Sequence, residues 1–214
     1  MAFVSAVGAL RAIPRRESYV FNIISPDRFK KIPWKNGRGV TSELAISEGS
    51  NLENFAWRIS IARVDKDGAF SDFSGLKRTL VLLGGRGIVL CHDETICERL
   101  LKPLDVAEFD GGQRTVGTLI SGPITDFNVM IREGQVRAEV AVHTTKTEIA
   151  LPRTMFGFVY SVFEDAEICD ASGVTVSKLQ SGYLLRGGES GPDGFRIRGR
   201  GLIEVEFSRA LALE

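Results

Sequence analysis

Two stretches of this chain end in a pair of glycines and read as copies of one β-unit: Leu101–Gly112 (LKPLDVAEFDGG) and Val176–Gly188 (VSKLQSGYLLRGG). The first glycines of the two pairs, at positions 111 and 187, lie 76 residues apart. Farther along, Asp126–Met130 (DFNVM) and Ile203–Phe207 (IEVEF) both read as strands, at an offset of 77 residues. A repeat of this kind predicts a fold built from two similar β-units.

Around the repeat, the chain reads as short strands separated by Gly, Asp or Asn turns. The stretch Ala56–Val64 (AWRISIARV) alternates apolar and polar residues, as a strand does. Arg78–Leu83 and Ile88–Cys91 flank Gly84–Gly87, which predicts a β-hairpin with a glycine-rich turn. The pattern predicts an all-β fold of sandwich or barrel type, in two tandem halves packed as one unit, with Val140–Pro152 as the crossover between them.

The length of 214 residues accommodates these two halves after a short N-terminal segment. We expect a loosely held leader over residues 1–18, a first β-roll with the ligand pocket over 19–139, and a degenerate second β-roll over 140–214. In the leader, the arginines follow the apolar stretch, whereas a secretory signal places its positive charge first.

Composition narrows the classes of function. A hydrophobic fraction of 43% and a charged fraction of 25% are typical of soluble globular proteins. The formal net charge of zero does not favour nucleic acid as a partner. Apolar runs fall short of the roughly 20 residues that span a bilayer, so no membrane partner is expected.

Cysteine and histidine are sparse. Cys91, Cys97 and Cys169 form an odd set without CxxC spacing, which predicts reduced thiols and a cytoplasmic location. His92 and His143 lack the spacing of metal ligands, and we expect both to be exposed to solvent. The sequence therefore predicts no metal, no cofactor and no covalent nucleophile.

The stretch Lys31–Glu43 (KIPWKNGRGVTSE) places Trp34, Lys35 and Asn36 on a glycine-rich turn. Such a turn can stack on, charge-pair with and hydrogen-bond a small anionic or planar ligand. The alternative interpretation is an ordinary hairpin turn with a buried tryptophan and a solvated lysine.

Strand alternation suggests where further polar groups could gather. Thr41 and Glu43 share one strand face, and so do Asp126 and Asn128. If these faces point inward, the interior of the barrel is a polar cavity with charges of both signs; otherwise they face solvent. The residues predicted to line this cavity are Glu43, Arg58, Asp126 and Asn128.

The segments PWKNGRGVTSE, WRISIARV and GPITDFNVM resemble the HutD/Ves family, in order over roughly Ile32–Arg132. The resemblance implies a cupin-like fold with two β-roll halves and without the cupin metal ligands. It also implies a cytoplasmic protein, associated with histidine utilisation, that senses an intermediate such as urocanate or formylated glutamate. The family's motif positions include Phe70 and Arg78, while Arg38 departs from the family, which more often has Gly there.

These observations predict a metal-free regulator or sensor that binds a small carboxylate, with a homodimer as a possible assembly. Two alternatives stay open: an enzyme with Glu43 or Asp126 as general base, and a protein-interaction module without a ligand. No catalytic residue is assigned. The predicted ligand-binding residues are Trp34, Lys35, Asn36, Thr41, Glu43, Arg58, Ser60, Asp126 and Asn128.

Overall fold

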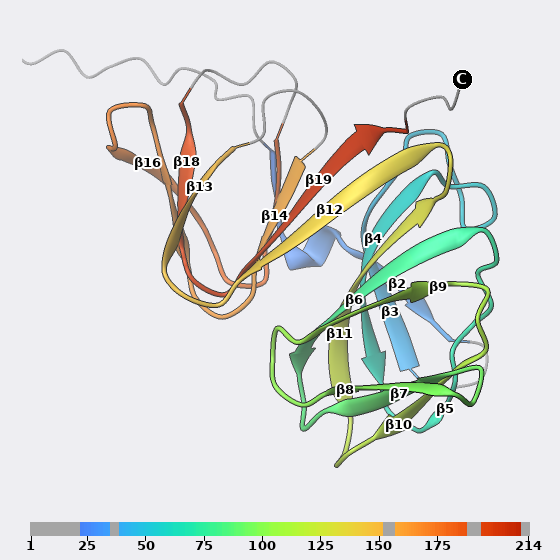
Figure 1. The fold of residues 1–214 in the computed structure, drawn as a ribbon. Helices are drawn as coiled ribbons and strands as arrows, with labels where there is room; N and C mark the ends of the chain where they lie inside the picture. The colour runs from blue at the N-terminus through green and yellow to red at the C-terminus, as the bar shows by residue number, and fades with distance from the viewer. Residues whose placement is uncertain (1–21, 35–38, 152–156, 188–193, 211–214) are drawn as a thin grey trace, which may run out of the picture.

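The structure is a computed structural model that describes residues 22–34, 39–151, 157–187 and 194–210 (Figure 1). Strands dominate these residues, and a single-turn 3-10 helix, η1 (Pro26–Arg28), accompanies them. The all-β prediction is therefore confirmed. The predicted leader, residues 1–18, lies outside the described residues, as do Lys35, Asn36 and Arg38 of the glycine-rich turn.

The first half is a pair of antiparallel sheets. In spatial order, the larger sheet contains β2 (Lys30–Pro33), β3 (Gly39–Ile46), β4 (Trp57–Val64), β11 (Ile124–Arg132), β6 (Leu76–Gly84) and β9 (Val106–Asp110). The smaller sheet contains β5 (Gly68–Ala69), β10 (Thr115–Leu119), β7 (Ile88–His92) and β8 (Ile96–Leu100).

The second half repeats this plan. Its larger sheet contains β1 (Asn22–Ile24), β17 (Leu184–Arg186), β14 (Gly157–Ser161), β19 (Leu202–Arg209) and β12 (Val136–His143). Its smaller sheet contains β13 (Thr147–Ala150), β18 (Arg196–Gly199), β15 (Ala166–Cys169) and β16 (Thr175–Leu179).

The two halves have the same strand order, as expected for two copies of one β-unit. The order β4-β11-β6-β9 recurs as β12-β19-β14-β17, and β5-β10-β7-β8 recurs as β13-β18-β15-β16. Equivalent strands β11 and β19 begin at Ile124 and Leu202, so their offset is 78 residues rather than the predicted 77. The difference matters because a shift of one residue reverses which face of a strand each side chain occupies. The fold is a cupin-like pair of β-rolls packed as one unit.

The halves are more closely joined than the predicted division after residue 139 suggests. That division falls inside β12, which pairs along its whole length with β19. The segment Val140–Pro152, predicted to be a crossover, contains the end of β12 and all of β13. In addition, β1 precedes the first half in the chain but pairs with β17 of the second.

The predicted hairpin at Gly84–Gly87 is wrong. Strand β6 belongs to the larger sheet of the first half and β7 to the smaller one, so this turn carries the chain between sheets. Gly85 has φ +99°, and a Cβ there would lie 2.6 Å from the carbonyl oxygen of Pro123. Only glycine fits this backbone conformation so close to a neighbouring strand.

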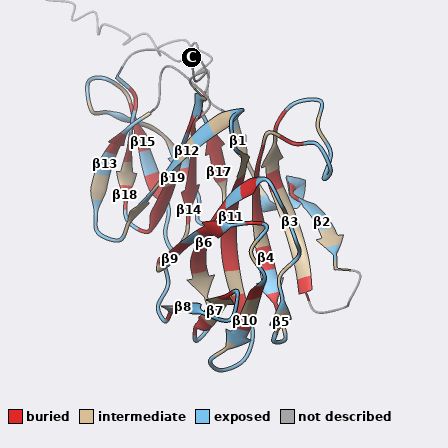
Figure 2. Ribbon diagram, turned by 45° about the vertical axis from the view of Figure 1, so that its right-hand side comes forward, coloured by how far each residue is buried: buried red, intermediate tan, exposed pale blue. Residues whose placement is uncertain are grey.

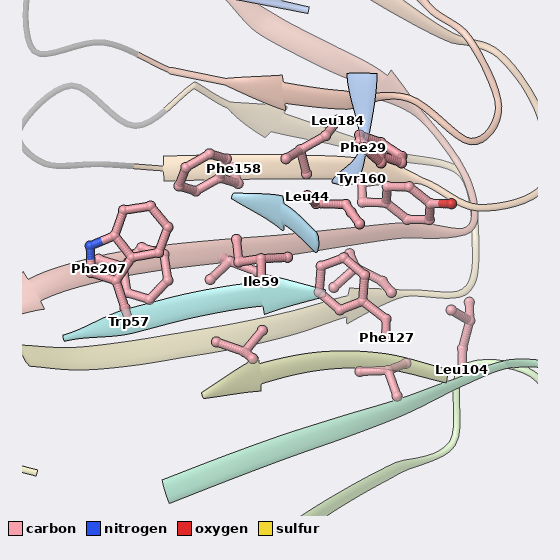
Figure 3. Close-up of a cluster of buried hydrophobic side chains, with 14 residues drawn as sticks. Phe29, Leu44, Trp57, Ile59, Leu104, Phe127, Phe158, Tyr160, Leu184 and Phe207 are labelled. Carbon is pink, nitrogen blue, oxygen red and sulfur yellow. The ribbon is translucent and has the colours of Figure 1, made fainter. Parts of the chain in front are cut away.

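The largest apolar cluster lies between the two larger sheets, so both halves contribute to it (Figure 3). Trp57 of β4 lies across this interface from β14 and β19, with ring centroids 5.4 Å from Phe158 and 4.7 Å from Phe207. Figure 2 shows buried residues on strands of both larger sheets, among them β6, β11, β14 and β19. The interface is therefore a core shared by the two halves.

The two histidines are not placed as predicted. His92 is 2% exposed, with Nδ1 2.9 Å from Oγ1 of Thr115 and its ring centroid 4.8 Å from that of Phe109. His143 ends β12 rather than lying in a crossover, and its Nε2 is 2.9 Å from a carboxylate oxygen of Glu204. The expectation of two exposed histidines is therefore wrong for His92, and His143 is half-buried and hydrogen-bonded to Glu204.

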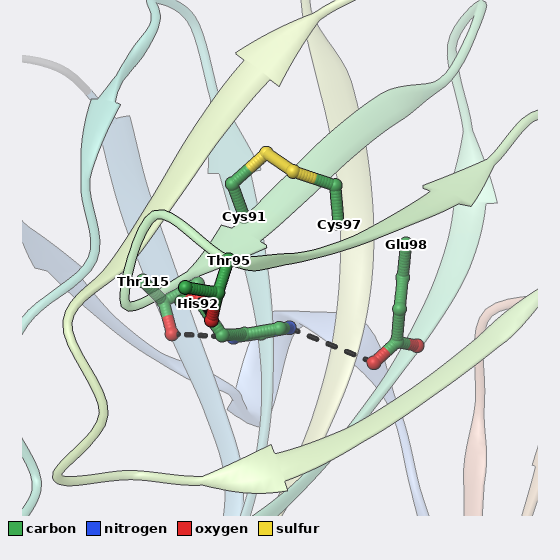
Figure 4. The surroundings of a disulfide bond; sticks show 6 residues. All are labelled: Cys91, His92, Thr95, Cys97, Glu98 and Thr115. Carbon is green, nitrogen blue, oxygen red and sulfur yellow. Dashed lines mark hydrogen bonds and ion pairs between the residues drawn. A yellow bond between two sulfur atoms is a disulfide. The ribbon is translucent and has the colours of Figure 1, made fainter.

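The expectation of three reduced thiols is also wrong. Cys91 of β7 and Cys97 of β8 are directly opposite cross-strand partners and form a disulfide, while Cys169 is free and buried (Figure 4). Cys91 and Cys97 are six residues apart and form no CxxC motif. Their pairing follows from the β7–β8 register, which no local motif in the sequence reveals. The described part of the chain has no helix long and apolar enough to cross a membrane.

The shared core predicts that Phe158→Ala destabilises the whole molecule. Phe158 is fully buried, so its truncation should cost about 3–5 kcal/mol of unfolding free energy, measured by chemical denaturation. Phe163→Ala, at a residue 47% exposed, is the control and should cost under about 1 kcal/mol. Two separate transitions, only one of them shifted, would contradict a core shared by both halves.

The disulfide predicts the pattern of thiol labelling. Alkylation of denatured protein without reductant should modify Cys169 alone, and prior reduction should expose all three cysteines. Cys91→Ser should release Cys97, so two thiols should then react without reductant. Mass spectrometry counts the labels, and three labels on unreduced wild type would contradict the disulfide.

Candidate functional site

A cavity of about 380 Å³ lies within the first half, against the inner face of its larger sheet. Its wall combines polar side chains of β4 and β11 with aromatic side chains from the segment between β5 and β6. Its described lining residues are Ile32, Pro33, Trp34, Thr41, Leu52, Arg58, Ser60, Ala62, Val64, Ala69, Phe70, Ser71, Phe73, Arg78, Asp126, Asn128 and Met130.

Strand alternation explains why polar groups face this cavity. On β4, Trp57 and Ile59 belong to the core between the halves, so Arg58 and Ser60 point the other way, into the first half. On β11, Phe127 occupies the same core, and its neighbours in the chain face the cavity. One direct cross-strand pair then brings the two polar sets together, with Ser60 opposite Asn128.

Arg58 is neutralised within the protein. It is 5% exposed, and its Nε donates to a carboxylate oxygen of Glu43 at 2.8 Å. Glu43 comes from β3, where a bulge between residues 43 and 45 interrupts the pairing with β4. Glu43 therefore acts on the cavity through Arg58 and is not itself a lining residue.

Arg78 of β6 is the second buried cation of the cavity wall. Its guanidinium carbon lies 4.9 Å from the centroid of Phe109, 5.2 Å from Phe70 and 5.6 Å from Phe73. Its Nη2 donates to Oδ1 of Asn128 at 2.9 Å. Among the described residues its Nε has no hydrogen-bond partner, which leaves one buried donor available.

Asp126 is the buried carboxyl of the same network. One of its oxygens, Oδ1, accepts a hydrogen bond from Nδ2 of Asn128, while Oδ2 has no partner in the part of the chain that the structure describes. Burial raises the pKa of Asp126 to about 7, although Arg78 and the Asn128 hydrogen bond act in the opposite direction. Burial also lowers the pKa of Arg78 to about 10, so the guanidinium stays charged at neutral pH.

Trp34 stands at the glycine-rich turn, where its Nε1 donates to Oγ1 of Thr41 at 2.8 Å. Its backbone N–H donates to the carbonyl of Gly39, which closes the turn of the β2–β3 hairpin. A Cβ on Gly39 would lie 2.2 Å from the carbonyl oxygen of Arg63 and 3.1 Å from the indole. The motif's last glycine therefore lets the indole pack beside the strand.

The structure places most of the predicted ligand residues on one cavity. Lys35 and Asn36 lie outside the described residues, and Glu43 reaches the site only through Arg58. The lining residues among the predicted set are Trp34, Thr41, Arg58, Ser60, Asp126 and Asn128.

The predicted ligand set lacks Arg78, although it was among the family's motif positions. Its position could have been found from alternation, because Arg78 shares a strand face with Leu80 and Leu82, which are fully buried. The aromatic wall of Phe70 and Phe73 has no such signal, because both residues lie in an irregular segment between strands. No three His, Cys, Asp or Glu side chains gather as a possible metal site in the described ranges.

The sequence of this chain is similar to a described protein family and to individual bacterial proteins. A family model described as HutD matches residues 27–199. An uncharacterized 21.2 kDa protein in the hutC 3′ region of Pseudomonas putida is 37% identical over 112 residues, covering 52% of this chain and 58% of that protein. Protein Ves of Escherichia fergusonii is 33% identical over 117 residues, which cover 53% of this chain and 60% of that protein. The chain thus spans less than two thirds of the length of these two relatives.

A solved structure extends the similarity over most of the fold. HutD from Pseudomonas fluorescens SBW25, in a formate condition, superposes with a TM-score of 0.77 at 26% sequence identity. That alignment covers 88% of this chain and 98% of the HutD chain. Because the family model also matches most of the sequence, this chain belongs to the HutD/Ves family.

Proposed function

We propose that this chain is a metal-free, small-molecule-binding protein that takes a small carboxylate such as urocanate or formylated glutamate into the cavity of the first half. The observation that carries the proposal is Arg78, a buried residue of the cavity lining whose guanidinium keeps one donor without a partner among the described residues. A buried charged donor without a partner is costly in a folded protein unless a ligand or water completes it. A carboxylate supplies both the charge and the acceptor.

The rest of the cavity suits a planar ligand. Trp34, Phe70 and Phe73 supply aromatic surface, and Ser60 and Asn128 supply hydrogen-bonding groups. The volume of about 380 Å³ is within the range of small-molecule sites.

We further propose that binding serves regulation or sensing in histidine utilisation. The support is the name of the Pseudomonas putida relative, which places its gene in the hutC 3′ region. An enzyme is the second candidate, because the pKa of about 7 at Asp126 is that of a general base working near neutral pH. Glu43 suits this role less well, since Arg58 already holds its carboxylate.

Calorimetry with urocanate, histidine and formylated glutamate tests the proposal on the full chain. At least one of them should bind saturably at one site per chain. Absence of binding by all three in folded protein would overturn it. If NMR shows that a bound compound is converted and that Asp126→Asn abolishes the conversion, the enzyme is favoured over the sensor.

Arg78→Lys tests the anchoring role of the guanidinium. Lysine keeps the charge but lacks the fork of donors, so carboxylate affinity should fall by about tenfold or more. Arg200→Lys is the control, because Arg200 is exposed, lies in the second half and pairs with Glu164. Wild-type affinity in a folded Arg78→Lys variant would show that Arg78 does not hold the ligand.

A further inference from the structure

Arg78, Asn128 and Asp126 form a continuous hydrogen-bonded row across β6 and β11. Arg78 donates to the amide oxygen of Asn128, and the amide nitrogen of Asn128 donates to Asp126. The central amide is thereby oriented, and each end of the row keeps one buried atom without a partner among the described residues: Nε of Arg78 and Oδ2 of Asp126. The row thus ends in a buried donor at Arg78 and a buried carboxyl oxygen at Asp126, and both residues line the cavity.

The charges around Asp126 come from the two strands that flank β11 and from β3, which lies beyond β4. Strand β6 brings Arg78, β4 brings Arg58, and β3 brings Glu43, which pairs with Arg58. Among the described lining residues the charged side chains are Arg58, Arg78 and Asp126. Together with Glu43, these groups sum to zero when Asp126 is ionised and to one positive charge when it is protonated.

The two forms of Asp126 therefore favour different ligand groups. An ionised carboxyl offers only acceptors and repels a second carboxylate, whereas it can accept a hydrogen bond from an amide N–H. A protonated carboxyl offers an O–H donor and leaves the charge of Arg78 uncompensated, which favours a carboxylate.

We propose that the protonation state of Asp126 selects the functional group held in the cavity, a carboxylate when Asp126 is protonated and a carboxamide when it is ionised. This inference rests on the proposed function, because it concerns the same cavity and the same anchoring arginine. Burial raises the pKa of Asp126 to about 7, so both forms are populated near neutral pH. A modest change in pH then changes which compounds the cavity takes.

Urocanate and its amide, urocanamide, are matched probes, because they share the imidazole ring and differ in the carboxylate or carboxamide group that Asp126 would select. With a pKa of about 7, the competent fraction for each probe changes roughly tenfold between pH 6 and pH 8. Calorimetry should show urocanate binding about tenfold more weakly at pH 8 and urocanamide binding up to about tenfold more tightly.

Asp126→Asn is the decisive variant, because Asn has the same shape and offers a donor and an acceptor at every pH. The ratio of the two dissociation constants should lose its pH dependence in Asp126→Asn. Asp165→Asn, an exposed position in the second half, should keep it. The wild-type ratio is informative even if Asp126→Asn fails to fold.

The possible outcomes are distinct. If both probes bind wild type with a ratio that does not change between pH 6 and pH 8, this inference is overturned and the proposed function stands. If the pH dependence persists in folded Asp126→Asn, another group is responsible and the inference is again overturned. If neither probe binds wild type at either pH, the proposal of urocanate as a ligand fails together with this inference.

Discussion

The packing of the two larger sheets against each other is the constraint on which the rest of the structure depends. Strands β4 and β11 give one face to this interface, through residues such as Trp57, Ile59 and Phe127. Side chains alternate along a strand, so the other face of both strands must turn into the first half. Arg58 and Asp126 are buried in a cavity because their neighbours in the chain are buried in the interface.

This constraint explains how much could be predicted from the sequence. The alternation around Trp57 and Asp126 could be read locally, so the strands and the shared face of the polar residues were predictable. Whether that face met solvent or a cavity depended on the second half, which covers the opposite face. Local patterns could not show which strands share a sheet. The turn at Gly84–Gly87 connects strands of different sheets, and Cys91 lies beside Cys97 only because of the β7–β8 register.

The buried charges of the cavity are poor contributors to stability. Removing Arg58, Arg78 and Asp126 from water carries a desolvation cost that ion pairs and hydrogen bonds only partly offset. Arg58 has a carboxylate partner, whereas Arg78 and Asp126 each keep an atom without one among the described residues. Apolar side chains of similar volume would pack more favourably in a purely structural core. The proposed binding role would account for this arrangement, because a preorganised binding site gives up stability for recognition.

The pairing of β1 with β17 bears on how the chain can be made and divided. Asn22–Ile24 leaves the ribosome long before its partner strand at Leu184–Arg186 is synthesised. A contact so distant in sequence forms late and slows folding. A gene fragment that encoded only the first half would leave β1 without its partner strand. It would also expose the apolar face of β4 and β11 to water. Although the two halves repeat one plan, neither could be inherited or expressed alone without losing part of its own structure.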